Sequence, residues 1–269
     1  MSSAALALVL ASAVVHALWN TLLAAARDTH AGAAASLLAA AVLFAPLAAL
    51  TWDVDAAAIP YMVASALLEL AYFWLLATAY ARAGVTFVYP VARGSAPVLV
   101  LLISVLALGV ALSFGQVAGV LAITAGVFLV RGVGHGDRRT LALALGVGAC
   151  IAGYTLIDKR GLRHADALPY FECMLVLVAV SYAAAVGGGA VRRAMGRRAV
   201  VTGIGMFTAY ALTLAALERA EAAPVAALRE TSVVMATLAA IALGRERAAA
   251  RAVLGAIAVV VGVAAIALA

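Results

Sequence analysis

Apolar residues fill this chain in blocks of about 20, and short clusters of charged, proline or glycine residues separate the blocks. Because a helix rises about 1.5 Å per residue, one such block covers the roughly 30 Å of hydrocarbon in a bilayer. The pattern therefore predicts an all-α integral membrane protein with ten transmembrane helices. Their predicted bounds are approximately 4–26, 31–51, 58–81, 85–107, 114–131, 140–157, 168–188, 199–217, 223–243 and 250–268.

The composition supports a membrane protein: 67% of the residues are apolar and 11% are charged. A soluble domain has about half apolar and about a quarter charged residues. The formal net charge of +6 does not indicate a nucleic-acid partner, because the arginines stand in short clusters between apolar blocks, where they meet lipid head groups. We expect contact with membrane lipid and no nucleic acid. Cys150 and Cys173 have no metal or redox spacing, so we interpret them as packing residues.

The chain aligns with itself when it is shifted by about 136 residues. The segment "ARGSAPV" then falls on "LRETSVV". The alignment superposes Arg93 on Arg229, Gly119 on Gly255, and Gly126 on Gly262. Apolar helices align easily by chance, but an arginine inside a membrane span is costly, so a shared one is specific.

This alignment predicts two repeats, residues 1–133 and 134–269, with five spans in each. Since five is odd, the second repeat enters the membrane from the opposite side, which makes the two repeats inverted. Many secondary transporters use this symmetry to open alternately to either side around a site at the repeat interface. The predicted architecture therefore favours transport.

Arginine and lysine in the connectors predict the orientation. With a cytoplasmic N-terminus, the four residues Lys159, Arg160, Arg163 and Arg219 would lie inside. Twelve would lie outside: Arg27, Arg82, Arg131, Arg138, Arg139, Arg192, Arg193, Arg197, Arg198, Arg245, Arg247 and Arg251. That distribution opposes the positive-inside rule. We therefore expect both termini on the non-cytoplasmic side.

The first span carries His16, Trp19 and Asn20 on one side of its helix. They have two interpretations. In the first, they form a cavity wall that hydrogen-bonds a solute, and this is the one we favour. In the second, they form a helix contact in which Asn20 bonds a neighbouring backbone and Trp19 only packs.

Two further ionisable residues, Glu69 and Arg93, lie well inside the third and fourth predicted spans. An ionisable group near the bilayer centre costs about 2.5 to 3.5 kcal/mol on insertion scales, so it faces a cavity or a partner. The two residues either form a structural pair, or Arg93 faces a water-filled cavity and attracts an anion while Glu69 carries a proton. Pro90 and Pro97 kink the fourth helix, which suits a cavity wall, and we favour that alternative.

The ninth predicted span repeats this pattern with Arg229 and Glu230. Neighbouring residues of a helix point about 100° apart, so at least one of the two needs a partner on another helix or a solute. Asp158, near the end of the sixth span, is expected at the membrane interface, where Lys159 and Arg160 neutralise it. Glu172, near the start of the seventh span, is expected at the interface too.

No motif for catalysis or cofactor binding occurs in the sequence. It has no H-E-x-x-H zinc helix, paired Asp-rich motif, P-loop lysine or G-x-S-x-G elbow. We therefore predict no catalytic residue, no metal site and no cofactor, and we do not expect ATP-driven transport by this chain alone.

Three segments resemble a known family: "HALWN", "YPVARGSAPVLVLL" and "ALRETSVVMATLAAIALGRERAAARAVLGAIAVVVGV". They look like the bacterial EamA-like branch of the drug/metabolite transporter superfamily, and the similarity spans essentially the whole chain. Its most specific part is "LGRER" followed by Gly255 and Gly262. The corresponding first-half loop, "LGVALSFGQ", lacks the glutamate and the arginine, so the two halves need not contribute equally to binding.

The resemblance implies a multi-pass protein of the bacterial inner membrane, a monomer or homodimer, with a central cavity between two five-helix halves. It implies export or uptake of small metabolites without ATP. It also selects ten candidate substrate-binding residues: His16, Trp19, Asn20, Glu69, Tyr72, Tyr89, Arg93, Tyr154, Tyr210 and Arg229.

Our leading hypothesis is a secondary transporter of a small polar metabolite, such as an amino acid or related organic anion, by alternating access. Arg93 and Arg229 would attract the anionic end, and Glu69 or His16 would carry the proton if transport is proton-coupled. The alternative is a membrane-embedded enzyme or lipid-handling protein, which a sideways-open cavity with clustered acidic residues or a metal would favour. A third reading is a structural or sensory subunit with Glu69 paired directly to Arg93.

Overall fold

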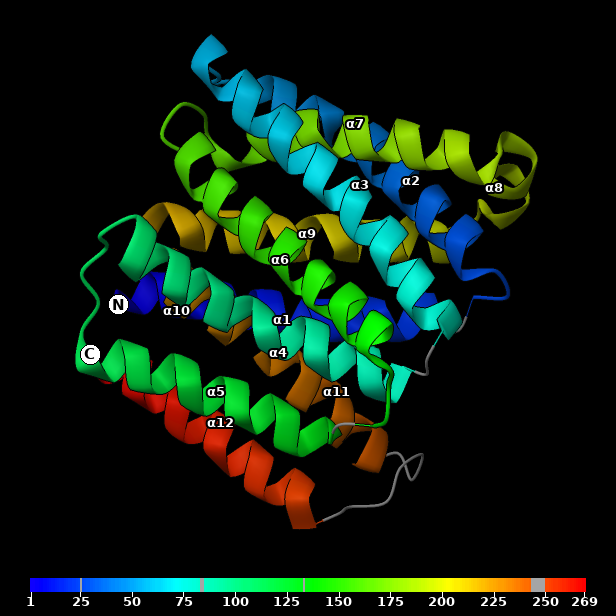
Figure 1. Ribbon diagram of the computed structural model, residues 1–269. Coiled ribbons are helices and arrows are strands. Elements are labelled where there is room, and N and C mark those ends of the chain that lie inside the picture. The colour runs from blue at the N-terminus through cyan, green and yellow to red at the C-terminus, as the bar shows by residue number, and fades with distance from the viewer. Residues whose placement is uncertain (25, 83–84, 133, 243–249) are drawn as a thin grey trace.

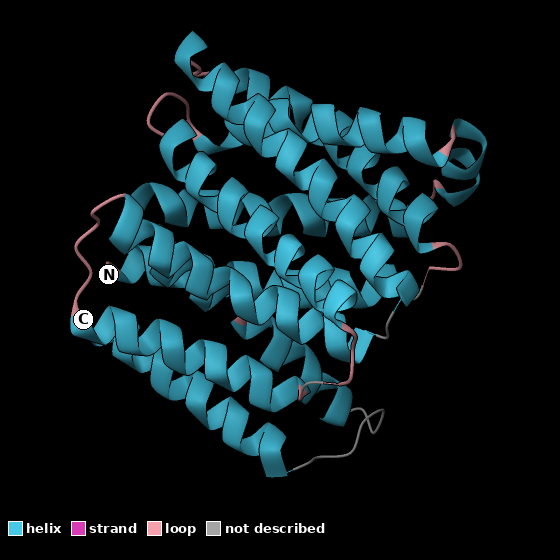
Figure 2. Cartoon of the chain, viewed as in Figure 1, coloured by secondary structure: helices cyan, strands magenta, loops and turns pink. Residues whose placement is uncertain are grey.

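The computed structural model describes residues 1–24, 26–82, 85–132, 134–242 and 250–269 (Figure 1). The described residues form an all-α protein, and Figure 2 shows helices joined by short connectors. The helices are α1 (Ser3–Ala24), α2 (Thr29–Leu50), η1 (Ala56–Ala58), α3 (Ile59–Arg82), α4 (Val85–Leu102), η2 (Ile103–Ala107), α5 (Phe114–Arg131), α6 (Arg138–Gly161), α7 (Ala167–Val186), α8 (Gly188–Ala194), α9 (Arg197–Arg219), α10 (Ala222–Arg229), α11 (Thr231–Ala242) and α12 (Ala250–Leu268).

The helices have the lengths and surfaces of a multi-pass membrane protein. Eight of the described helices are long and apolar enough to cross a bilayer, and the apolar segment Phe114–Val130 is shorter. Large apolar side chains lie on the outside, among them Val42 at 77% exposed and Leu106 at 78% exposed. Such a surface would be unfavourable in water, but lipid chains are equally apolar, so it forms the lipid-facing perimeter.

The ninth predicted span is not one continuous helix. α10 ends at Arg229 and α11 begins at Thr231, with Glu230 between them. The Thr231 hydroxyl donates to the Leu228 carbonyl at 2.7 Å, which satisfies one backbone acceptor at the break. The "LGRER" segment lies outside the described residues.

Small residues bring α5 and α12 together. A Cβ atom added to Gly126 would lie 2.7 Å from the Gly255 carbonyl oxygen, and one added to Gly255 would lie 2.6 Å from that of Gly126. Gly119 and Gly262 meet in the same reciprocal way, at 2.7 Å in both directions. Close backbone approach of this kind is how helices associate in lipid, where no hydrophobic force acts between them.

Polar and aromatic contacts hold the other helix pairs. The Ser12 hydroxyl of α1 donates to the Ala209 carbonyl of α9 at 2.6 Å and lies 2.8 Å from the Thr213 hydroxyl. Phe44 of α2 stacks on Phe207 of α9 with ring centroids 3.8 Å apart. α3 packs on α6, and α2 also packs on α7.

The two ends of the bundle differ. At one end, the connectors 53–55 and 164–166 form an antiparallel bridge between Val54 and Ala165. The Asp55 N–H donates to the His164 carbonyl at 2.8 Å, and the Asp166 N–H donates to the Asp53 carbonyl at 3.0 Å. We call this the bridged end. Both chain termini lie on the same side of the bundle as the bridged end (Figure 1).

The opposite end carries arginines at the helix termini, and we call it the arginine end. Its described arginines include Arg27, Arg82, Arg138, Arg198 and Arg251. Asp137 also lies there, where it caps α6 by accepting from the Thr140 N–H at 2.7 Å and pairs with Arg82 at 3.4 Å. Hydrogen bonds from Thr140, assisted by the Arg82 charge, hold the pKa of Asp137 below its ordinary value.

Candidate functional site

A buried ion pair lies in the middle of the bundle. Nη1 of Arg93 on α4 donates to Oε1 of Glu230, between α10 and α11, at 3.0 Å. Arg93 is 8% exposed and Glu230 is 1% exposed. Nη2 of Arg93 lies 2.7 Å from Nε2 of His16 on α1. Because a guanidinium only donates hydrogen bonds, Nε2 is the acceptor, and the His16 ring is neutral with its proton on Nδ1.

Small residues around Arg93 let α4 approach its neighbours. A Cβ at Gly94 would lie 2.5 Å from the Phe128 ring of α5, so only glycine fits there without a shift. On the α6 side, Gly148 contacts Ser95 and the Ala92 carbonyl. These contacts fix the helix that carries Arg93 and hold the guanidinium inside the protein.

Arg229 lies beside the ion pair with weaker compensation. Its Nη2 donates to the Tyr154 hydroxyl of α6 at 3.1 Å, and its Nε lies 4.0 Å from Oε1 of Glu230. Nε of Arg229 and Oε2 of Glu230 are buried and have no hydrogen-bond partner among the described residues. One carboxylate therefore serves two guanidinium groups.

A second polar cluster surrounds Asp158, which is 0% exposed. The Tyr170 hydroxyl of α7 donates to Oδ1 at 2.9 Å, and the Tyr210 hydroxyl of α9 donates to Oδ2 at 2.5 Å. Tyr210 also contacts Tyr154, with ring centroids 6.2 Å apart. The Asp158 cluster is thus continuous with the side chains that surround Arg229.

The prediction that Asp158 reaches the interface is wrong. α6 continues to Gly161, four residues past its predicted end, and Gly161 leaves room for the Tyr170 ring. Lys159 does not neutralise Asp158: its Nζ donates to the Leu217 and Ala220 carbonyls at 2.6 and 3.0 Å, where it caps the end of α9.

The interfacial prediction for Glu172 is wrong too. Glu172 is 6% exposed, and both carboxyl oxygens are buried without a hydrogen-bond partner in the described part of the chain. It lies on the same helical stripe as Leu175 and Ala179, three and seven residues further on, which face the interior. Its position near the start of a span did not reveal that its face is the inner one.

The structure separates the three candidates of the first span. His16 contacts Arg93, and the Trp19 ring packs edge-on against the His16 ring at 4.8 Å. The Trp19 side chain also packs on Gly205 of α9. Asn20 donates to the His16 carbonyl at 2.7 Å, so its amide bonds its own helix.

The structural pair proposed between Glu69 and Arg93 is wrong, because Glu230 is the carboxylate that bonds Arg93. Glu69 lies partly exposed on α3, within electrostatic range of Asp158 and Arg229. Tyr89 and Tyr72 are partly exposed as well. The Arg93 guanidinium lies 5.8 Å from the centroid of the Tyr89 ring.

Three contributors were absent from the sequence-derived site list: Glu230, Asp158 and Tyr170. Glu230 was detectable as a charged residue next to Arg229 inside an apolar block. Tyr170 gave no such signal, because a tyrosine near the end of a span is ordinary at a membrane interface.

Comparisons with known proteins agree with this architecture. Residues 138–268 match the EamA-like transporter family. The whole chain is also similar in fold to a protein of known crystal structure, with a TM-score of 0.74 and 18% sequence identity, covering 100% of this chain and 97% of that one. No curated protein matches the sequence significantly. The chain therefore carries a domain of the EamA-like transporter family, in the drug/metabolite transporter superfamily, at residues 138–268.

Proposed function

We propose that this protein is a secondary transporter that moves a small polar metabolite with an anionic group, such as an amino acid or related organic anion, by alternating access. The observation that carries the proposal is the shared carboxylate. Arg93 and Arg229 are both buried, and Glu230 is the acidic group within 4.0 Å of each. Arg93, Arg229 and Glu230 together carry a net charge of +1, which an anionic solute would neutralise.

Arg229 is the better docking point of the two arginines. Arg93 already has a carboxylate and an imidazole as hydrogen-bond acceptors. Arg229 has the neutral Tyr154 hydroxyl as its hydrogen-bond acceptor. A carboxylate bound by a guanidinium gains charge-assisted hydrogen bonds, which are roughly twice as strong as neutral ones. Solute access is supported by the partial exposure of His16, Glu69 and Tyr210 around the cluster.

Helix packing supports the inverted-repeat arrangement with repeats 1–133 and 134–269. If the first and second halves are exchanged, the contact of α3 with α6 becomes that of α9 with α1, and both contacts exist. The α5–α12 contact maps onto itself, as does the reciprocal approach of Gly126 and Gly255. In this arrangement the ten spans are the eight long helices, α5, and the broken pair α10–α11.

The bridged end supports a state closed on that side. Opening it requires loss of the two backbone hydrogen bonds between connectors 53–55 and 164–166. It also separates the stacked rings of Tyr61 and His164, whose centroids lie 5.7 Å apart. The arginine end has no corresponding bridge among the described residues. The positive-inside rule assigns the arginine end to the cytoplasm and both termini to the opposite side.

Proton coupling, if transport uses it, has a physical route through His16. A protonated imidazole cannot accept from Arg93, so protonation would break that hydrogen bond and leave the Arg93 donor for another acceptor. Glu69 is the second proton-linked candidate, because it is partly exposed next to Asp158 and Arg229.

The test is a screen of amino acids and organic anions for compounds that stabilise the purified protein against heating, followed by flux measurement in liposomes. We expect Arg93→Ala and Arg229→Ala to lower the flux of each hit at least tenfold, a loss of about 1.4 kcal/mol. The matched control is Arg219→Ala, whose side chain is 49% exposed. Unchanged flux in both central variants at normal protein abundance would overturn the proposal.

A further inference from the structure

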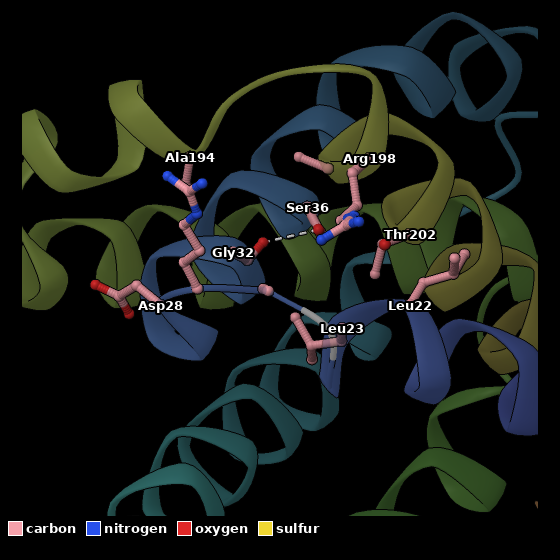
Figure 3. A pocket seen from close by; sticks show the side chains of 11 residues that line it. Leu22, Leu23, Asp28, Gly32, Ser36, Ala194, Arg198 and Thr202 are labelled. Carbon is pink, nitrogen blue, oxygen red and sulfur yellow. Dashed lines mark hydrogen bonds between the residues drawn. The ribbon is translucent and has the colours of Figure 1, made fainter. Parts of the chain in front are cut away.

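A cavity lies at the arginine end, at the edge of the bundle. It has a volume of about 160 Å³ and is formed by the end of α1, the start of α2, α8 and the first turns of α9 (Figure 3). Its polar walls include Arg27, Ser36, Arg198 and Thr202, and its apolar walls include Leu22 and Leu23. None of these residues belongs to the central cluster, so this site has its own chemistry.

Thr202 is the unexplained polar group of this cavity. The residue is 1% exposed, and its hydroxyl has no hydrogen-bond partner among the described residues. An unsatisfied buried hydroxyl is destabilising, so a ligand that accepts a hydrogen bond from it gains affinity. In the view of Figure 3, the Arg198 guanidinium lies between the hydroxyl groups of Ser36 and Thr202. An anion that draws the guanidinium outward would uncover the Thr202 hydroxyl.

The backbone and charge favour an anion. α9 begins here, and its N-cap residue Gly196 has no side chain that could cap the helix. The first N–H groups of α9 therefore receive no side-chain cap from Gly196 and form the positive end of the helix dipole. Arg27 and Arg198 add two positive charges. The opposing charge is Asp28, whose carboxylate already accepts from the Ala31 N–H at 3.0 Å. The net charge of these three side chains is +1.

The apolar wall indicates where the anion comes from. Leu22 and Leu23 lie at the end of α1, and Leu22 is 36% exposed on the lipid-facing perimeter. A cavity with arginines on one side and lipid-facing leucines on the other matches a phosphate head group joined to acyl chains. Free phosphate would use the polar wall alone. A phosphate diester is a strong hydrogen-bond acceptor and pairs well with arginine.

We propose that this edge cavity binds the phosphate group of an anionic phospholipid. Arg198 and Thr202 donate to the phosphate, Arg27 neutralises it, and Leu22 and Leu23 contact the first acyl carbons. The lipid then joins the α1–α2 connector to the start of α9. This proposal does not depend on what the central cluster transports.

The test measures lipid binding by the purified full chain in zwitterionic detergent, using native mass spectrometry with phosphatidylglycerol, phosphatidylcholine and inorganic phosphate as separate probes. We expect phosphatidylglycerol to bind, phosphatidylcholine to bind at least fivefold more weakly, and inorganic phosphate to leave lipid binding unchanged at millimolar concentration. Equal binding of both lipids, or displacement of the lipid by inorganic phosphate, would overturn the lipid assignment.

Two variants test the residues. Arg198→Gln should weaken phosphatidylglycerol binding about tenfold, and the isosteric Thr202→Val should weaken it about threefold, with wild-type melting temperature in the absence of lipid. The matched control is Arg193→Gln on the exposed face of α8. Wild-type binding by both cavity variants, or an equal loss in Arg193→Gln, would refute the site.

Discussion

Arg93 and Arg229 hold corresponding places in the two predicted repeats, but their partners differ. Arg93 has a carboxylate at 3.0 Å and an imidazole, whereas Arg229 has a tyrosine hydroxyl and reaches the same carboxylate at 4.0 Å. The difference begins with the next residue, which is Gly94 in one half and Glu230 in the other. Gly94 is pressed against Phe128, so the first half has no room there for a carboxylate.

The two arginines therefore differ in how well their charges are compensated. The Glu230 carboxylate from the second half neutralises the first-half arginine, which ties the halves together. The second-half arginine is left as the less compensated charge. Under the proposed function, the less compensated arginine is the one that binds the anionic solute, so the two halves would contribute unequally to binding.

The largest expected effect comes from removing the shared carboxylate. Glu230→Gln removes the carboxylate that lies within 4.0 Å of both buried guanidinium groups, so the free energy of unfolding should fall by about 3 to 5 kcal/mol. Denaturant unfolding in detergent micelles measures it. Glu221→Gln is the control, because Glu221 is exposed and makes no side-chain cap bond. A loss below about 1 kcal/mol would show that Glu230 does not stabilise the pair.

The next effect distinguishes the arginines directly. Arg93→Ala leaves Glu230 without its close partner, so we expect both stability and flux to fall. Arg229→Ala removes the less compensated of the two charges, so stability should be unchanged or higher while flux falls at least tenfold. Thermal unfolding and liposome flux of the same preparations measure both quantities. Identical behaviour of the two variants would contradict the assigned asymmetry.

A smaller effect is expected from the hydroxyl that orients Arg229. Tyr154→Phe removes one hydrogen bond, worth about 1 kcal/mol, so the apparent substrate affinity should fall about fivefold with little change in stability. Tyr182→Phe serves as the control, because it removes a hydrogen bond to His30 far from the central arginines. An equal change of substrate affinity in both variants would contradict the prediction.

The smallest effect concerns the exposed ion pair of Asp137 and Arg82, which contrasts with the buried one. The pKa of Asp137 is depressed, so its stabilising contribution is present above its unfolded pKa and is lost as the pH falls through the folded value. We expect wild type and Asp137→Asn to differ slightly in melting temperature at pH 7 and to converge on acidification. A difference that grows toward low pH would have the wrong sign.

Helix positions were predictable because block length and hydropathy determine what crosses a bilayer. The break between α10 and α11 was not, since residues 222–242 are apolar on both sides of it. The break lies at Arg229 and Glu230, which hydrogen-bond Tyr154 and Arg93 on other helices. The fold class was therefore predictable from the sequence, and the interruption of the helix was not.

The candidate site was predictable only in part. The cost of an arginine in a membrane identified Arg93 and Arg229. The partner of Arg93 is 137 residues away in the chain, so the alternative that paired Arg93 with the nearer Glu69 was wrong. Asp158 and Glu172 were misplaced because distance from a span's end says nothing about which neighbour, such as Tyr170, covers the side chain.

The most direct test of a positively charged centre combines a change in the solute with a change in the protein. Flux is measured for the best-transported amino acid and for the corresponding amide, in which a neutral carboxamide replaces the carboxylate. Both solutes are measured in wild type and in Arg229→Ala. We predict that wild type transports the amide at least tenfold more slowly than the amino acid, and that Arg229→Ala transports the two at similar rates. The same preference for the amino acid in both proteins would contradict the account, because the carboxylate would then not meet Arg229.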